Sequence, residues 1–261
     1  MAKRFHTTWE FKHIMPPHLL NRRQAIMLSA IGTLASLDPA LLAAEDESPR
    51  GQLQVRKVLF LGNSITLHGP APQIGWTGNW GMAASREELD YAHRLTQRIG
   101  QHASGEPQVL VKNIADFERG LDTFPITEKL AQELGYQADL VVLAIGENVA
   151  ALNSDELQER YAKAFASLVG EIQKQGPSTL LIRSCFWADA VKDKIMRRIC
   201  ESVSAVWVDI STLGHQPENS ARSERTIEHA GVAGHPGDRG MQAIADALWM
   251  ALTKQRSLWK E

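Results

Sequence analysis

Five short apolar segments, separated by stretches of helical pattern, constrain the fold of this chain most. They read KVLFL (57–61), QVLVKNI (108–114), DLVVLAI (139–145), STLLIRSCF (178–186) and AVWVDI (205–210). Each segment is apolar nearly throughout rather than alternating, as expected for strands that are covered on both faces. Strands of this kind with helices between them predict a parallel sheet that has helices on both sides.

The segments between the predicted strands carry the periodicity of amphipathic helices. Two apolar stripes stand out, formed by Leu157, Tyr161, Phe165, Leu168 and Ile172 in one helix and by Met241, Ile244, Ala245, Leu248 and Leu252 in another. Asn153 and Glu156 predict a capping box at the start of the first of these helices. We therefore predict a single three-layer α/β/α domain of flavodoxin-like type, with a five-stranded parallel sheet in the order 2-1-3-4-5.

The first 44 residues differ from the rest in pattern. Arg22 and Arg23 precede a 13-residue apolar run, Ala25 to Leu37, which is followed by a helix-breaking Asp-Pro pair and small residues. That order is typical of a secretory signal peptide, and the paired arginines resemble a twin-arginine export signal. Because the run is shorter than the roughly 18 residues of a membrane span, we expect no stable transmembrane helix. The sequence thus predicts a signal peptide in residues 1–44 and an exported bacterial protein, periplasmic or secreted.

The charge of the remaining chain argues against one class of partner. Without residues 1–44 the chain has 23 basic and 28 acidic residues, a net charge of −5 with His neutral. No basic stripe is left to follow a phosphate backbone, so we expect no nucleic-acid partner. The length suits one domain, for which we predict residues 56–254, with a linker at 45–55 before it.

The two cysteines do not form a disulfide framework. Cys185 ends a predicted strand, and Cys200 lies near the far end of the helix that follows it. At about 1.5 Å per helical residue the two are too far apart for a bridge. We expect two buried thiols and no metal site.

Two polar residues follow predicted strands, and a third lies just before the last predicted helix. Ser64 in LGNSIT follows the first strand, and Asn148 in GEN follows the third, which neighbours the first in the predicted order. His235 in AGHPGD lies in a long polar loop, 212–238, just before the last helix. A serine hydroxyl needs a base to become a good nucleophile, and His235 can supply one. The carboxyl edge of the sheet is therefore the predicted site.

These residues resemble the marks of the SGNH (GDSL-type) hydrolases. That family has a Ser in a G-[DN]-S turn after strand one, a Gly after strand two, a G-x-N turn after strand three and a late His. The resemblance runs from about Arg56 to Leu252, and it implies a serine esterase without metal or organic cofactor. It implies Ser64 as nucleophile, His235 as base, and an oxyanion hole made by the N–H groups of Ser64 and Glu118 and the side chain of Asn148.

The sequence departs from this family at two positions. Glu118, in NIADFERG, stands where the family has its second Gly, and Gly81 is a lower-ranked alternative for that role. Val232 stands three residues before His235, where the family usually has the acid that orients the imidazole. Either a backbone carbonyl orients His235, or another carboxylate reaches it, for which Glu228 and Asp209 are the candidates.

Other aromatic and basic side chains lie in the two long loops. Trp76 and Trp80, in the loop 67–81, are candidates for stacking on a sugar, and their alternative role is to pack that loop onto the domain. We expect His68 to be a solvated loop residue, and His215 and His229 are fallback bases.

Taken together, the sequence predicts an exported serine esterase that acts on small acyl esters, with acetylated carbohydrate or another small-molecule or polysaccharide ester as substrate. One alternative is a non-catalytic periplasmic carbohydrate-binding protein on the same fold, in which the missing Asp marks lost chemistry. Another is a lipase or thioesterase of the same family.

Overall fold

The computed structural model of the protein describes residues 51–176 and 178–261. The signal peptide predicted for residues 1–44 lies outside the described residues. Among the described helices none is both long and apolar enough to cross a membrane.

Five parallel strands form the central sheet, in the order β3-β2-β4-β5-β6. They are β2 (Lys57–Gly62), β3 (Gln108–Asn113), β4 (Leu140–Ala144), β5 (Thr179–Arg183) and β6 (Val206–Val208). Phe60 in the central β2 lies opposite Val111 of β3 and Val142 of β4. Counted within this sheet alone, β2 is the first strand and β3 the second, so the observed order is the predicted 2-1-3-4-5. The predicted fold class and strand order are therefore confirmed.

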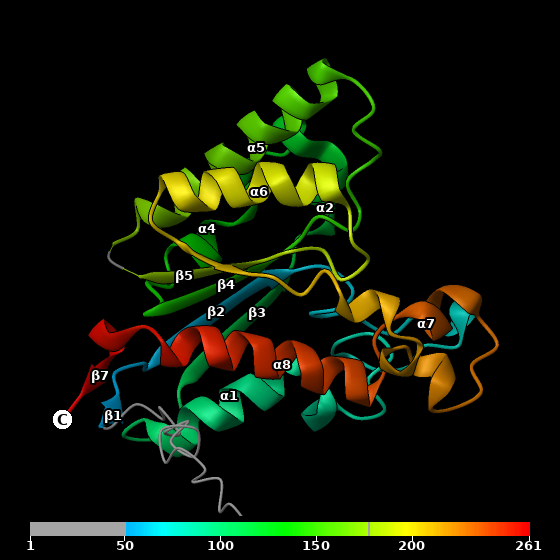
Figure 1. Cartoon of the computed structure of the whole chain (residues 1–261), viewed down its shortest axis with the longest axis horizontal. Helices are drawn as coiled ribbons and strands as arrows, with labels where there is room; N and C mark the ends of the chain where they lie inside the picture. The colour runs from blue at the N-terminus through cyan, green and yellow to red at the C-terminus, as the bar shows by residue number, and fades with distance from the viewer. Residues whose placement is uncertain (1–50, 177) are drawn as a thin grey trace, which may run out of the picture. The chain divides into compact units, whose positions relative to one another are not determined.

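Helices cover both faces of the sheet (Figure 1). On one face lie α1 (Tyr91–His102) and α8 (Asp238–Thr253); on the other lie α2 (Ala115–Gly120), α3 (Ile126–Lys129), α4 (Ala131–Leu134), α5 (Asp155–Gln173) and α6 (Ala190–Ser202). Because side chains alternate along a strand, Val58 and Phe60 join the core beneath α1 and α8, whereas Leu59 and Leu61 join the core beneath α5 and α6. Each fully buried apolar side chain of this size stabilises the fold by roughly 1.5–3 kcal/mol.

The two helices with predicted apolar stripes pack as expected. All five stripe residues of α8 are buried, and in α5 only Leu157 stays partly exposed. The capping box predicted from Asn153 and Glu156 is wrong by one residue: α5 begins after Ser154, whose hydroxyl accepts the Leu157 N–H at 3.3 Å. Ser caps a helix as well as Asn does, so composition could not separate the two.

A two-stranded antiparallel pair joins the first and last segments of the described domain. It joins β1 (Gln52–Leu53) to β7 (Trp259–Lys260), next to the 3-10 turn η8 (Arg256–Leu258). Leu53, Val55 and Trp259 are buried in the core beneath α1 and α8. The folded domain therefore extends past the predicted bounds of 56–254, and Leu53 and Val55, in the predicted linker, are buried.

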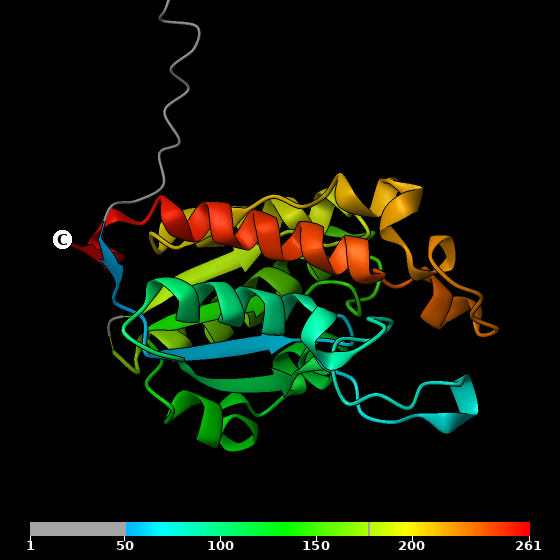
Figure 2. The same cartoon turned by 90° about the horizontal axis from the view of Figure 1, so that it is seen from below.

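Two long loops lie at the carboxyl ends of the strands (Figure 2). The loop 67–81 contains η2 (Pro72–Ile74), and the loop 212–238 contains η5 (Leu213–His215), η6 (Pro217–Asn219), η7 (Ala221–Ser223) and the short helix α7 (Ala230–Gly234). The loops pack against each other through a small apolar cluster that includes Trp76 from the first and Val232 from the second. Both cysteines are free and buried, as predicted.

Candidate active site

The turn that carries Ser64 leaves β2 at the carboxyl edge of the sheet. It begins at Gly62, where a Cβ would overlap the Thr66 hydroxyl, so a larger residue does not fit. The side chain of Asn63 accepts the Ile65 N–H at 3.1 Å, which holds the turn in shape. Ser64 is thereby left half-buried, with its hydroxyl facing the loop 212–238.

His235 meets Ser64 from that loop. The Ser64 Oγ and the His235 Nε2 are 2.8 Å apart, although the two residues are 171 positions apart in the chain. This is hydrogen-bond distance between a nucleophile and a base. The structure thus brings together the two residues that the sequence singled out.

The backbone carbonyl of Gly231 orients the imidazole. It lies 2.7 Å from the His235 Nδ1, and the His235 N–H bonds to the Val232 carbonyl instead. The tight turn at the end of α7 therefore leaves the Gly231 carbonyl free for the side chain four residues later. Because a carbonyl only accepts, Nδ1 carries the proton and Nε2 is free to accept one from Ser64.

No carboxylate replaces the missing acid among the described residues. The candidate Asp209 accepts hydrogen bonds from Ser211 and Ser184, and no bond joins Glu228 to His235. Val232 is only 3% exposed and belongs to the apolar cluster between the two loops. Of the two alternatives left open by the sequence, the backbone carbonyl is the one observed.

The surroundings of His235 favour its neutral form. Burial lowers the pKa of His235 below its ordinary value, although the Gly231 carbonyl and the charge of Glu147 act in the opposite direction. The nearby His68 and His229 lower the pKa of His235 further. A neutral imidazole is the form that can accept a proton.

The prediction that the Glu118 N–H helps form an oxyanion hole is wrong. Glu118 lies within α2, its N–H points back to the Ile114 carbonyl at 3.4 Å, and only 1% of the residue is exposed. The reason is that the chain becomes helical at Ala115, directly after β3, so that the main chain at Glu118 is enclosed in the helix. Its carboxylate instead faces the turn after β4, which holds Asn148.

The turn after β4 has the shape that its sequence GEN implies. Gly146 has a φ of +126°, and a Cβ there would lie 2.5 Å from the Cys185 sulfur, so glycine is required. Asn148 is half-buried, and it lines the same cavity as Ser64 and His235. The structure thus places the predicted amide at the site.

A buried ion pair lies beneath these turns. The Glu147 carboxylate accepts a hydrogen bond from Arg183 at 2.6 Å and another from the Asn63 side chain at 2.6 Å. Burial alone would raise the pKa of Glu147, but the Arg183 guanidinium lowers it below its usual value. Burial and the charge of Glu147 raise the pKa of Glu118, against the effect of its hydrogen bonds.

Two groups remain as donors for an oxyanion. The Ser64 N–H has no acceptor among the described residues, and the Asn148 side-chain amide lines the cavity. Gly81, the alternative to Glu118, is excluded because its N–H donates to Asp90 at 3.0 Å.

The cavity in front of Ser64 has a volume of about 500 Å³ and mostly polar walls. Its walls include His68 and His229 as well as residues that the sequence did not assign to the site, namely Ile74, Met82, Asn113, Ala115, Asp116 and Arg119. His68, which we expected to be solvated, is half-buried there. Of the two fallback bases, His229 lines the cavity, whereas His215 is exposed and lies outside it. Nothing local in the sequence marks these residues, because the pairing of strands and loops brings them together.

Trp76 and Trp80 do not offer a free ring to a substrate. Trp76 is 7% exposed, the two rings pack edge to face at 5.5 Å, and their N–H groups donate to the carbonyls of His68 and Ala84. Their role is to pack the loop 67–81, the alternative that the sequence left open. The exposed ring is that of Trp187, which is 40% exposed and lies edge to face with His235, 5.1 Å between ring centres.

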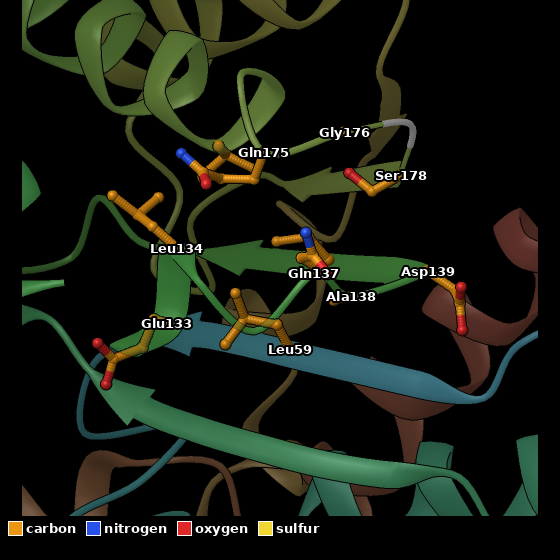
Figure 3. A pocket seen from close by; sticks show the side chains of 11 residues that line it. Leu59, Glu133, Leu134, Gln137, Ala138, Asp139, Gln175, Gly176 and Ser178 are labelled. Carbon is orange, nitrogen blue, oxygen red and sulfur yellow. The ribbon is translucent and has the colours of Figure 1, made fainter. Parts of the chain in front are cut away.

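A second cavity, of about 250 Å³, lies beside the turns that lead into β4 and β5 (Figure 3). Its two acidic side chains have structural partners: Glu133 pairs with Lys112 at 3.2 Å, and Asp139 accepts the Lys57 N–H at 2.9 Å. Among the described residues that line it, none form a nucleophile–base pair. Within residues 51–176 and 178–261, no group of three or more His, Cys, Asp or Glu side chains is placed to hold a metal ion.

Comparisons with known proteins give solved structures but no sequence match. No protein-family model matches the chain, and no curated protein matches it. An alpha/beta hydrolase enzyme from the metagenome of Lake Arreo, Spain, is 21% identical, over 76% of this chain and 94% of that one, with a TM-score of 0.47. An acetyl xylan esterase from Geobacillus stearothermophilus is 17% identical, over 76% and 94%, with a TM-score of 0.46.

A carbohydrate acetylesterase from Sinorhizobium meliloti is 15% identical, over 75% of this chain and 99% of that one, with a TM-score of 0.43. At these identities and TM-scores, the similarity carries no argument about the chemistry of this chain. That chemistry has to be inferred from the geometry of its site.

Proposed function

We propose that the protein is a serine esterase of the SGNH type, which hydrolyses small acyl esters with a Ser64–His235 dyad. One observation carries the proposal: Ser64 Oγ lies 2.8 Å from a His235 ring whose other nitrogen is held by the Gly231 carbonyl. A hydroxyl, a base and a group that fixes the tautomer of the base are the parts that nucleophilic acyl transfer requires. All three lie at one cavity, together with the Asn148 amide.

This geometry supports the following proton path. Ser64 Oγ attacks the ester carbonyl while its proton passes to His235 Nε2, and the negative charge on the carbonyl oxygen is met by the Ser64 N–H and the Asn148 amide. The tetrahedral adduct collapses when Nε2 returns the proton to the leaving alcohol oxygen. Water then attacks the acyl-Ser64 ester while His235 Nε2 takes its proton. This second adduct collapses as Nε2 returns the proton to Ser64 Oγ, which releases the carboxylic acid and regenerates the free hydroxyl.

The walls of the cavity support a small acyl group on a polar alcohol. Polar and charged side chains outnumber the apolar contacts, which come from Ile74, Met82 and Ala115 among others, so the cavity favours a small acyl group over a long acyl chain. The exposed Trp187 ring beside His235 supports a sugar as the alcohol, because an exposed aromatic ring can stack on a sugar face. Acetylated carbohydrate is therefore the substrate class we propose.

The test is hydrolysis of p-nitrophenyl acetate by residues 45–261, beside the Ser64→Ala variant. We expect turnover by the wild type and a loss of roughly 10³-fold or more in kcat for the variant. Equal rates for the two proteins would rule out the esterase and favour a non-catalytic binding protein. A panel of acetylated polysaccharides, long-chain esters and thioesters, assayed with the active protein, then tests the substrate class.

A further inference from the structure

The inference concerns Glu118 and rests on the proposed function. We propose that the buried Glu118 carboxylate is a positioning residue, which fixes the Asn148 side-chain amide with its N–H₂ group available to the oxyanion. Glu118 stands where the SGNH hydrolases have their second Gly. Its carboxylate, rather than its backbone N–H, is the group that contributes to the site.

The contacts of Glu118 converge on the oxyanion turn. One carboxylate oxygen accepts the Gly146 N–H at 2.6 Å and the Asn148 N–H at 3.1 Å, and the other accepts the Asn148 Nδ2 at 2.8 Å. The first oxygen also accepts the side chain of Asn63, beside the nucleophile, at 3.3 Å. One buried side chain therefore joins the turn after β2 to the turn after β4.

These partners determine which way the Asn148 amide faces. A carboxylate accepts only, so the Nδ2 must point toward Glu118, and a guanidinium donates only, so the Oδ1 must point toward Arg119, 3.3 Å away. One Nδ2 hydrogen is used by Glu118, and the second is left for the cavity that Asn148 lines. With the amide turned over, an oxygen would replace the donor and repel the oxyanion.

The substitution Glu118→Gln removes the negative charge and one acceptor at this position while it keeps the volume of the side chain. All four groups that contact the Glu118 carboxylate are donors, but a glutamine of the same shape offers one acceptor and one donor. If the glutamine oxygen accepts the N–H groups of Gly146 and Asn148, the glutamine N–H₂ group faces the Asn148 Nδ2, and two donors then meet. The Asn148 amide must then turn over or move away.

A double-mutant cycle tests this action through Asn148. The variants Glu118→Gln, Asn148→Ala and the double variant are compared with the wild type for kcat and KM on p-nitrophenyl acetate. We expect each single variant to lower kcat by about 10²-fold, the typical effect of losing one oxyanion donor, with KM changed by less than about threefold. We expect the double variant to match Asn148→Ala within about threefold, because Glu118 has nothing left to position.

Glu133→Gln is the matched control. Glu133 is also a buried glutamate, 3% exposed, but it lines the second cavity (Figure 3). Its carboxylate pairs with Lys112 at 3.2 Å. Its variant should keep the wild-type kcat. A loss of kcat in Glu133→Gln equal to that in Glu118→Gln would overturn the inference, since any buried carboxylate would then have the same effect.

The remaining outcomes are distinct. A double variant in which the two losses multiply would show that Glu118 acts independently of Asn148, and would refute the inference while leaving the esterase intact. Wild-type turnover by Ser64→Ala would instead refute the proposed function. If Glu118→Gln does not fold, as judged by circular dichroism, the same cycle is run with Glu118→Asp, which keeps the charge but withdraws it from Asn148 by one methylene.

Discussion

His235 relies on a main-chain carbonyl where a serine hydrolase triad uses a carboxylate. The Gly231 oxygen fixes the tautomer and the orientation of the His235 ring. A triad acid does this and also stabilises the imidazolium with its negative charge. A neutral carbonyl stabilises an imidazolium less than a carboxylate would, and burial acts in the same direction. The dyad should therefore be weaker than a full triad but active at a lower pH.

The pH profile of kcat/KM tests this difference. Because His235 must be neutral to act as base, and its pKa is lowered, the acidic limb should have its midpoint below the ordinary histidine value of 6.5. The rate should then be flat toward neutral pH. The measurement is kcat/KM for p-nitrophenyl acetate between about pH 4 and 8. A midpoint above 6.5 would mean that a carboxylate pairs with the imidazolium after all.

Trp187 should affect sugar esters more than small esters. Removing its half-exposed ring in Trp187→Ala should raise KM for acetylated oligosaccharides about three- to tenfold relative to p-nitrophenyl acetate, the usual contribution of one aromatic contact. Trp187→Phe, which keeps a ring against His235, should stay close to the wild type. A parallel change in KM for both substrates would place the ring outside the sugar-binding surface.

At the carboxyl ends of the strands, the structure brings together the polar side chains that the sequence singled out. Ser64, Asn148 and His235 could be found from the sequence because each lies at the end of a strand or just before a helix, in a fixed order. The carboxylate of Glu118 could not, since it bonds to residues 28 and 30 positions later, and nothing in NIADFERG indicates them. Trp187 was missed because its exposure depends on the packing of the loop after β5.

At the scale of elements, the loop with His235 is held by the start of α8. The Glu224 carboxylate accepts the N–H groups of Asp238 and Arg239, each at 2.8 Å, in the first turn of that helix. An anion at a helix N-terminus satisfies free N–H groups and the helix dipole. The same carboxylate pairs with Arg225, which donates to the Ala83 carbonyl and so joins the loop to the segment after Gly81.

Glu224→Ala should therefore weaken both the fold and the site. We expect the free energy of unfolding, from urea denaturation, to fall by about 1–2 kcal/mol, and kcat to fall severalfold as the His235 loop loosens. Glu228→Ala, at an exposed position in the same loop, is the control and should change stability by less than about 0.5 kcal/mol. Equal effects of the two variants would refute the capping role.

Long elements were predictable and short ones were not. The five strands of the central sheet and the helices α5 and α8 lie in segments whose patterns extend over several residues, so the period is readable. The pair β1–β7 and the five-residue α7 depend on contacts between distant parts of the chain. The helix α1 begins only at Tyr91, after a loop that contains Gly81 and ends at the Asp90 cap.

At the scale of the whole molecule, export remains a proposal. The motivating observation is Arg22-Arg23 before a 13-residue apolar run. When the full chain is expressed in a bacterium with a twin-arginine pathway, we expect mature protein in the periplasm, with its N-terminus near Ala44. The double substitution Arg22→Lys, Arg23→Lys should keep it in the cytoplasm. Cytoplasmic, uncleaved wild-type protein would contradict the prediction.

The architecture explains why one small cavity can collect the whole site. A parallel sheet brings the turns after β2 and β4 to the same edge, and the two long loops pack there against each other. Ser64, His235 and Asn148 thus come from three distant segments, and hydrogen bonds hold each of their side chains in place.

Trapping the acyl-enzyme tests the central claim most directly. The protein is mixed with p-nitrophenyl acetate, quenched in acid within a turnover, digested, and its peptides are weighed by mass spectrometry. The dyad predicts one acetyl group on the peptide that contains Ser64, and none on that peptide in Ser64→Ala. Turnover of the ester with the acetyl group on another residue, or with no acetylated peptide and full activity in Ser64→Ala, would contradict it.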